Sequence, residues 1–212
     1  ITGIGQGYIQ TTPLQLCLMT AQLANGGHKI YPKITVNEGE DSLNEIKYKM
    51  SISEKLNDED KKSNFLKAGE GFFQSDQKKY FKLYRNQENI KFVLDAMFSS
   101  TNEVRGTSYS SRIEDPKYQF AGKTGTSQVK RITAIARELD LTTSEIPYKD
   151  RDHALYIAFG PYKNPRYAVS ILIEHGGSGS RTAAPLATKL FKLIIDRHEQ
   201  RIKLKEENLV IS

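Results

Sequence analysis

Residues 153–174 read HALYIAFGPYKNPRYAVSILIE and contain two apolar runs separated by a short polar link. The link, PYKNPR, carries the dipeptide Asn164-Pro165, which is typical of turns. A short link of this kind predicts two strands that pair as a hairpin. Because both runs are apolar on two sides, we expect the hairpin to lie inside a sheet that is covered on both faces.

A further strand and a covering helix are predicted on either side of this hairpin. Residues 118–129, YQFAGKTGTSQV, have the character of a strand, whereas RTAAPLATKLFKLIIDRHEQ, residues 181–200, is amphipathic with Pro185 in its first turn. The residues in helical register there are Leu186, Leu190 and Ile194. The sequence therefore predicts an α+β fold, in which three adjacent antiparallel strands carry a helix, residues 181–198, on one face.

Two more helices are predicted in the first half of the chain. Thr11 or Thr12 can cap a helix that has Pro13 in its first turn and stops at Gly26-Gly27. The segment QENIKFVLDAMFSSTNE, residues 87–103, has helical periodicity. Its expected apolar face consists of Ile90, Val93, Leu94, Met97 and Phe98. Residues 131–140 are a further candidate helix.

The domain organisation follows from length and local composition. The chain has 212 residues, which is enough for one domain with a real core. Residues 37–86 are charged and weakly periodic, so we interpret them as a surface insertion, and residues 199–212 as a C-terminal tail. No signal peptide or membrane-spanning run is present in the sequence. The first residue is Ile1 rather than methionine, which is the pattern of an excerpt or a processed piece.

Composition argues against several classes of function. Lys and Arg total 31 against 25 Asp and Glu, a net charge of +6, and the positive charges are scattered, so no nucleic-acid partner is expected. The single cysteine, Cys17, is expected to be a buried thiol because its neighbours are apolar. One cysteine cannot form a disulfide framework. The four histidines show no metal-ligand spacing, so neither a metal nor a cofactor is predicted.

The segment Lys123-Thr124-Gly125-Thr126 raises the question of phosphate binding, because P-loops contain Gly-Lys-Thr. The first glycine of a P-loop would fall at position 117, which is Lys117. A lysine side chain does not fit the tight backbone turn that wraps the phosphate. The upstream GIGQGY also fails as a dinucleotide fingerprint, because its third glycine would fall on Tyr8. Nucleotide binding is therefore not expected, and an ordinary strand with a bulge is the remaining structural alternative.

The order of several motifs along the chain resembles a known family. GIGQGY is followed by TPLQL, then by AGKTGTSQV, AFGPYKNPRYAVSILIEHGG with a further glycine at Gly179, and a final helix. This order resembles the C-terminal half of the transpeptidase domain of class B penicillin-binding proteins, closest to the elongation-type penicillin-binding protein 2 group. The resemblance covers residues 1–34 and 88–196 well and does not extend convincingly to the insertion. It implies the fold shared by penicillin-binding transpeptidases and serine β-lactamases.

The resemblance also implies a chemistry for the site. It implies acyl transfer from stem peptides ending in D-Ala-D-Ala to a serine nucleophile, with β-lactams as inhibitors. Lys123 matches the position whose ammonium attracts the substrate carboxylate, and Gly125 lets a peptide or β-lactam lie against the strand. Thr126 matches the residue that binds the carboxylate through its hydroxyl and supplies a backbone N–H to the oxyanion hole. Thr124 is better interpreted as a packing or orienting residue of the substrate-binding strand.

The nucleophile itself is expected to precede this chain. The family's Ser-x-x-Lys motif occurs twice by sequence, and its Ser-x-Asn motif twice; the hits are Ser75–Lys78, Ser127–Lys130, Ser42–Asn44 and Ser100–Asn102. We reject Ser75 because its surroundings, FQSDQKKYF, are polar and because the spacing to Lys123 is too short for the family. We also reject Ser127, because it follows Lys123 on the same predicted strand and its side chain cannot also face the edge of that strand as the nucleophile. The early strands of the domain should be missing too, which would leave a sheet edge or an apolar face without a partner.

Further expectations come from the resemblance alone. The partners would be stem peptides, β-lactams, the upstream half of the same domain and a membrane glycosyltransferase of the elongation machinery. The location would be the periplasmic face of the bacterial inner membrane, with an N-terminal anchor outside this chain. Two alternatives remain open at this level: a non-catalytic penicillin- or peptidoglycan-binding or sensor module, and a serine β-lactamase-like hydrolase.

Overall fold

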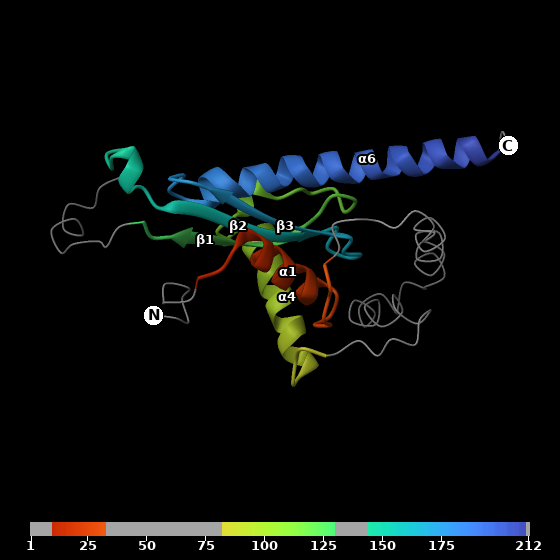
Figure 1. Ribbon diagram of the computed structural model, residues 1–212, viewed down its shortest axis with the longest axis horizontal. Helices are drawn as coiled ribbons and strands as arrows, with labels where there is room; N and C mark the ends of the chain where they lie inside the picture. Colours follow the sequence, from red (N-terminus) through yellow and green to blue (C-terminus); the bar gives the residue numbers. More distant parts are fainter. Residues whose placement is uncertain (1–9, 33–81, 130–143, 211–212) are drawn as a thin grey trace.

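A computed structural model describes residues 10–32, 82–129 and 144–210 of the protein (Figure 1). Several expectations fall outside these residues: the glycine-rich start, most of the 37–86 insertion, the 131–140 helix, and the motif hits at Ser42–Asn44 and Ser75–Lys78. The described residues contain the hairpin, the Lys-Thr-Gly segment and the three long helices that surround them.

The sheet has three antiparallel strands, as the sequence predicted. Strand β1 spans Ala121–Ser127, β2 spans His153–Gly160 and β3 spans Tyr167–Ile173. The strands lie in the order β1-β2-β3, with Gly122 opposite Ala158 and with Tyr156 opposite Ile171. The central strand, β2, is buried along most of its length, as expected for a strand that is apolar on two sides.

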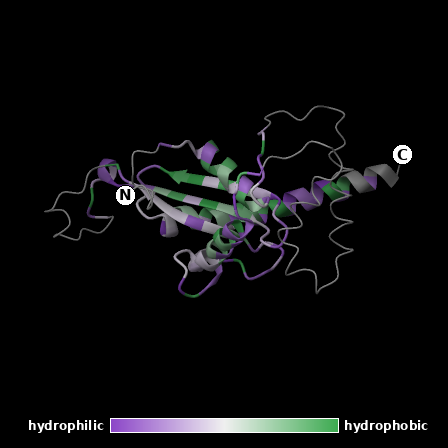
Figure 2. Ribbon diagram, turned by 90° about the horizontal axis from the view of Figure 1, so that it is seen from below, coloured by the Kyte–Doolittle hydropathy of each residue, from purple (hydrophilic) through white to green (hydrophobic). Residues whose placement is uncertain are grey.

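Helices cover both faces of this sheet (Figure 1). Helix α6, Ala184–Val210, packs on one face, whereas α1, Pro13–Ala24, and α4, Gln87–Asn102, lie on the other. Two apolar cores result, and β2 and β3 carry most of the hydrophobic residues of the sheet (Figure 2). Shorter elements, Tyr109–Ser111, Tyr148–Asp150 and the π-helical turn Gly179–Ala183, connect these layers.

The core beneath α6 is built on aromatic rings. The rings of Phe120 and Phe191 stack with their centroids 4.9 Å apart, and Tyr156 meets Phe120 edge-on. The predicted stripe of α6 lies at the margin of the buried face: Leu190 packs against this core and Ile194 is half-buried, whereas Leu186 is 36% exposed. The fully buried stripe is the adjacent one, Ala187, Phe191 and Ile195. Both stripes of this helix are apolar with the same spacing, so periodicity could not distinguish them. Packing selects the stripe that brings the Phe191 ring onto Phe120.

The core on the other face joins α4 to β1 and β2. Leu94 and Met97 are buried there with Ala121 and Phe159, and Ile90 and Phe98 pack against them. Val93, expected on the same face of the helix, is 38% exposed, so that part of the predicted face is wrong. The buried stripe of α4 is therefore narrower than the apolar stripe that the sequence predicted.

Helix α6 continues far beyond the sheet (Figure 1). The segment expected as a C-terminal tail, residues 199–212, continues this helix as far as Val210. Among the helices that the structure describes, none has the length and apolar character needed to cross a membrane.

Helix α1 begins with the predicted cap. The hydroxyl of Thr12 accepts a hydrogen bond from the Gln15 backbone N–H at 3.2 Å, and the Gln15 side chain accepts one from the Thr12 N–H at 2.8 Å. This reciprocal pair is a capping box, with Pro13 at the first helical position.

Replacing Thr12 with alanine should destabilise the fold by about 1 kcal/mol, because the Gln15 backbone N–H at the start of α1 loses its acceptor and the Gln15 side chain loses the hydrogen bond from the Thr12 hydroxyl. The measurement is the free energy of unfolding by chemical denaturation. Thr11→Ala is the matched control, since the neighbouring Thr11 is exposed and is not the capping residue. Equal stability losses in the two variants would contradict the capping role.

Candidate active site

The Lys-Thr-Gly segment lies on β1, which is an edge strand of the described sheet. The backbone N–H of Gly122 donates to the Thr101 hydroxyl of α4 at 3.0 Å, so it points away from β2. Because backbone direction alternates along a strand, the N–H and C=O groups of Thr124 and Thr126 also face away from β2. No described strand covers that side of β1. The edge is therefore open to an extended ligand.

The four predicted site residues lie in line along this edge. Lys123 is exposed, and its ammonium donates to the Thr124 carbonyl at 2.7 Å. Strand alternation places Lys123 and Gly125 on one face, and Thr124 and Thr126 on the other. The backbone N–H of Thr126 has no partner among the residues that the structure describes. A cation and a free N–H donor thus occur within four residues of one strand edge.

Two glycines of β1 differ in what surrounds them. A Cβ on Gly122 would lie 2.4 Å from the Tyr156 hydroxyl oxygen and 2.8 Å from the Ile157 carbonyl oxygen, so packing requires glycine there. A Cβ on Gly125 would lie 3.4 Å from the Leu155 Cβ, which is an ordinary contact. The fold therefore does not demand glycine at position 125. Its missing side chain instead leaves space beside the strand.

A chain of hydroxyls approaches β1 from the loop after α4. The Thr124 hydroxyl lies 3.3 Å from that of Thr107, which lies 3.2 Å from the hydroxyl of Ser100. The loop reaches this position because Gly106 packs against the last turn of α4, where a Cβ would lie 2.4 Å from the Ser100 carbonyl oxygen. Thr124 is thus half-buried, and the Thr107 hydroxyl holds it from the side.

The Ser100–Asn102 motif hit has a structural role in this fold. The Asn102 side-chain amide donates to the Phe98 and Phe120 carbonyls, at 3.1 and 2.9 Å. These bonds tie the end of α4 to the residue before β1. Both hydrogens of the Asn102 side-chain amide are consequently occupied by backbone carbonyls.

A buried group of three hydroxyls behind β1 was not anticipated from the sequence. The Tyr156 hydroxyl lies 3.0 Å from the Thr101 hydroxyl and 3.1 Å from the Ser108 hydroxyl. Burial raises the pKa of Tyr156, although its hydrogen bonds to Ser108 and Thr101 lower it, and the net result is a phenol that stays protonated. We call Thr101, Ser108 and Tyr156 the hydroxyl cluster.

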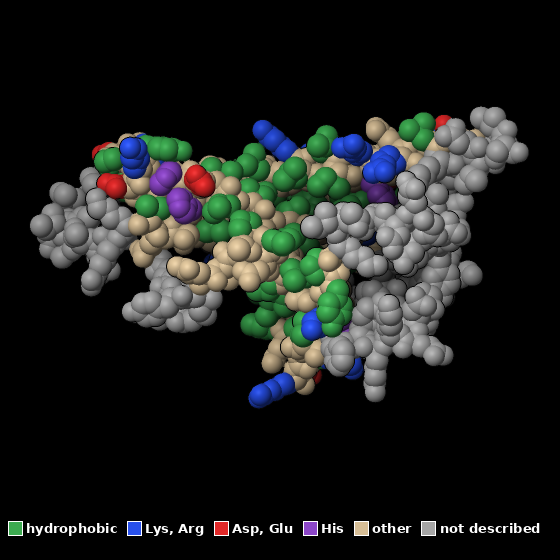
Figure 3. Space-filling view, in the orientation of Figure 1, with side chains coloured by type: hydrophobic (Ala, Val, Ile, Leu, Met, Phe, Trp, Pro, Cys, Tyr) green, Lys and Arg blue, Asp and Glu red, His purple; other side chains and the backbone are tan. Residues whose placement is uncertain are grey.

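A histidine pair lies at the end of the sheet where β1 and β3 end and β2 begins. The His175 backbone N–H donates to Nδ1 of His153 at 2.9 Å, and Nδ1 of His175 lies 3.0 Å from the Arg151 carbonyl oxygen. His175 has a φ of 55°, a left-handed conformation that few side chains adopt without such support. Histidine side chains gather at this end of the molecule (Figure 3). The pair anchors the turn after β3.

The glycines after this turn bring the loop onto the sheet. Gly177 has a φ of 75°, and a Cβ on Gly179 would lie 2.5 Å from the Leu155 carbonyl oxygen and 2.6 Å from that of Gly125. The loop before α6 therefore packs on the backbone of the Lys-Thr-Gly strand.

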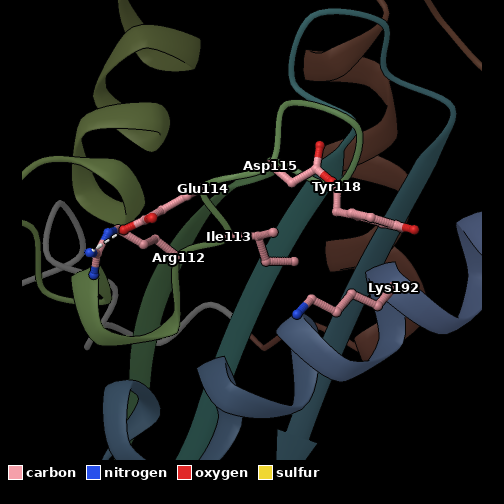
Figure 4. Close-up of a pocket in the computed structure, with 6 residues that line it drawn as sticks. All are labelled: Arg112, Ile113, Glu114, Asp115, Tyr118 and Lys192. Carbon is pink, nitrogen blue, oxygen red and sulfur yellow. Dashed lines mark hydrogen bonds and ion pairs between the residues drawn. The ribbon is translucent and has the colours of Figure 1, made fainter.

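A pocket of about 380 Å³ lies elsewhere, between the loop after Ser111 and α6 (Figure 4). It is lined by Arg112, Ile113, Glu114, Asp115, Tyr118 and Lys192. An Arg112–Glu114 ion pair of 2.6 Å occupies one side. Because no residue of β1 lines this pocket, it is separate from the strand that carries the predicted site residues.

The described residues contain neither a metal-binding group nor an activated thiol. These residues contain no group of three or more His, Cys, Asp or Glu side chains arranged to hold a metal ion. The Cys17 thiol is half-buried, donates to the Ala168 carbonyl at 3.4 Å, and has a pKa raised by burial. Its environment is that of a packing thiol and not of an activated nucleophile.

Residues 1–194 match the family described as the penicillin binding protein transpeptidase domain. Peptidoglycan D,D-transpeptidase MrdA of Salmonella typhimurium is 31% identical over 194 residues, covering 92% of this chain and 26% of the relative. MrdA of Escherichia coli K12 is 28% identical over 194 residues, covering 92% of this chain and 25% of the relative. At 25–26% of their length, the chain spans a minor part of these curated relatives.

Solved structures agree with this match. The structure of penicillin-binding protein 2 with MreC from Helicobacter pylori has a TM-score of 0.61 at 25% identity, covering 92% of this chain and 27% of that one. Penicillin-binding protein 2 of Pseudomonas aeruginosa in complex with WCK 5153 has a TM-score of 0.56 at 30% identity, covering 91% and 32%. The α+β fold predicted from the sequence is therefore that of the penicillin-binding transpeptidases.

Proposed function

This chain belongs to the penicillin-binding protein transpeptidase family, and we propose that it forms the C-terminal part of a peptidoglycan D,D-transpeptidase with β1 as its substrate-binding strand. The proposed reaction cross-links stem peptides during cell-wall elongation by acyl transfer to a serine. The observation that carries the proposal is the open edge of β1, where the backbone groups of Thr124 and Thr126 face away from the sheet.

An open edge is suited to a peptide substrate. An extended peptide can add to it as a further strand, with main-chain hydrogen bonds providing affinity. The missing side chain of Gly125 leaves room for that peptide or for a β-lactam ring. The specificity for a chain terminus then depends on the charged group beside the edge.

That charged group is Lys123. Its ammonium bonds a backbone carbonyl, a weak partner that a substrate carboxylate can replace. The hydroxyl of Thr126 is a second carboxylate donor in this proposal. The Thr126 N–H would stabilise the oxyanion that develops when a serine attacks the D-Ala-D-Ala amide, a contribution often worth about 3 kcal/mol.

The proposed partners follow from the same assignment. The substrates are stem peptides ending in D-Ala-D-Ala, and β-lactams are the mimics that acylate the same serine. The upstream half of the domain supplies that serine, and a membrane glycosyltransferase supplies the glycan strands. The Helicobacter pylori relative was solved with MreC, so a partner of that type is a further candidate. Action at the periplasmic face of the inner membrane is part of the proposal.

Covalent labelling by a fluorescent penicillin tests the proposal. The full-length protein that contains these 212 residues should form an adduct that survives denaturation and is blocked by prior incubation with benzylpenicillin. The 212-residue chain by itself should not, because the Ser75–Lys78 and Ser127–Lys130 hits are not expected to be competent. Labelling of this chain that disappears in Ser75→Ala would show that a short-range motif set is catalytic after all.

The same experiment separates the alternatives. A sensor module without acyl chemistry would leave the full-length protein unlabelled while still binding penicillin reversibly. A β-lactamase-like hydrolase would consume benzylpenicillin in bulk, whereas a transpeptidase should hold the acyl group and turn over slowly. A labelled full-length protein that hydrolyses excess benzylpenicillin rapidly would therefore replace the proposed function with the hydrolase.

A further inference from the structure

We infer that the hydroxyl cluster of Thr101, Ser108 and Tyr156 positions the Lys123 strand for acylation, acting from behind β1 without touching the substrate. The inference rests on the proposed function of β1. It assigns a role to three residues that come from α4, from the loop after it and from β2.

The cluster is complete as a hydrogen-bond network. All three residues are buried, and the Tyr156 hydroxyl lies within 3.1 Å of both other hydroxyls. Ser108 donates to the Ser100 carbonyl at 3.0 Å and therefore accepts the Tyr156 O–H. The Thr101 proton is then directed to the Tyr156 oxygen or to the Met97 carbonyl, 3.3 Å away, so each of the three protons has an acceptor. Satisfied networks of this kind hold their members in one arrangement, because an unpaired polar group in the interior is costly.

The network ends on the backbone of β1. Thr101 accepts the Gly122 N–H at 3.0 Å, and Gly122 immediately precedes Lys123. At a sheet edge, this N–H would otherwise face outward without a strand partner. Thr101 therefore takes the place of a neighbouring strand at one position. The following outward N–H groups, at Thr124 and Thr126, have no strand partner among the described residues, and the Thr124 carbonyl accepts the Lys123 ammonium.

The position of Gly122 is also set by the Tyr156 side chain. A Cβ at residue 122 would fall 2.4 Å from the Tyr156 oxygen, so the strand passes very close to the phenol. The loop that carries Ser108 also carries Thr107, whose hydroxyl meets Thr124 at 3.3 Å. A shift of the cluster would consequently displace Lys123 and Thr124 together. Acyl transfer is sensitive to such shifts, because a misplacement of about 1 Å can cost about a hundredfold in rate.

Two pairs of substitutions separate positioning from simple stability. Tyr156→Phe removes the central hydroxyl and keeps the ring, and Tyr167→Phe is its control, because the buried Tyr167 hydroxyl on β3 has no hydrogen-bond partner among the described residues. Thr101→Val removes the acceptor of the Gly122 N–H, and Thr101→Ser restores a hydroxyl there. All variants are assayed in the full-length protein, well below their unfolding temperatures.

Two readouts are needed. Amide hydrogen exchange at Gly122 reports whether the strand is held, and acylation by benzylpenicillin, separated into its binding and chemical steps, reports whether holding it matters. We expect Tyr156→Phe and Thr101→Val to speed exchange at Gly122 and to slow the chemical step by about three- to tenfold, as for loss of one hydrogen bond. Tyr167→Phe and Thr101→Ser should stay within about twofold of the parent on both readouts.

Each other outcome overturns the inference. Unchanged exchange in Tyr156→Phe and Thr101→Val would mean that the cluster does not hold β1, and faster exchange with an unchanged chemical step would mean that it only stabilises the fold. A full-length parent that is never acylated would reject the proposed function itself, and the positioning role with it. An acylated parent with unaffected variants would reject the positioning role alone.

Discussion

Replacing Lys123 with alanine should slow acylation of the full-length protein by benzylpenicillin about ten- to a hundredfold, the equivalent of roughly 1.5 to 3 kcal/mol. The reason is the loss of a charge-assisted hydrogen bond to the substrate carboxylate at a strand edge. In the structure the ammonium is exposed and bonded to the Thr124 carbonyl, so it is free to exchange that neutral acceptor for a charged one.

Two further variants sharpen this prediction. Lys123→Arg should be milder than alanine but not neutral, because a planar guanidinium replaces a compact ammonium. Lys189→Ala is the matched control, since Lys189 is exposed on α6 and is not part of the β1 edge. The measurement is the second-order acylation rate, with thermal unfolding recorded in parallel. Parental acylation by a folded Lys123→Ala protein would reduce the Lys-Thr-Gly segment to an ordinary strand.

The largest stability effect among these substitutions is expected for Gly122→Ala, at about 2 kcal/mol or more of lost unfolding free energy. The new methyl group would lie 2.4 Å from the Tyr156 oxygen and 2.8 Å from a backbone carbonyl oxygen of β2. The carbonyl belongs to the sheet and cannot move alone, and moving the Tyr156 ring would break its bonds to Thr101 and Ser108.

Gly125→Ala provides the control on the same strand. Its added methyl group would make an ordinary 3.4 Å contact with Leu155, so the unfolding free energy should change by no more than about 0.5 kcal/mol. Acylation of Gly125→Ala should nevertheless be slower, because the methyl group occupies space that the proposed ligand needs. Thermal and chemical unfolding of both variants check the first expectation. Equal stability of the two would show that β1 is not confined at Gly122 as the structure indicates.

The elements that the sequence predicted correctly are those defined by local pattern. The hairpin of residues 153–174, the Lys-Thr-Gly strand and the cap at Thr12 all appear where expected. Strand pairing across a short link, helix capping and proline at a first turn depend on residues that are neighbours in the chain. The presence of these three features can therefore be inferred from the local sequence.

Part of the candidate site could likewise be predicted from the sequence, and part could not. Lys123, Thr124, Gly125 and Thr126 could be singled out because they are contiguous and accompanied by flanking motifs. The residues that surround them, Thr101, Thr107, Ser108 and Tyr156, were missed, because serine, threonine and a tyrosine within an apolar run have no distinctive pattern. The Thr101–Tyr156 contact joins residues 55 positions apart in the sequence, and local periodicity cannot predict a contact over such a separation.

The sequence by itself thus determined the class of fold, the order of its strands and the strand that carries the candidate site. The tertiary structure alone decided which stripe of α6 is fully buried, because the adjacent stripes ending at Ile194 and Ile195 are both apolar and only the second brings Phe191 onto Phe120. It also decided that the Gly122 N–H turns outward to Thr101, which leaves the backbone of Thr126 at an open edge. Both outcomes depend on contacts between distant segments, whose free energies exist only when the whole core is packed.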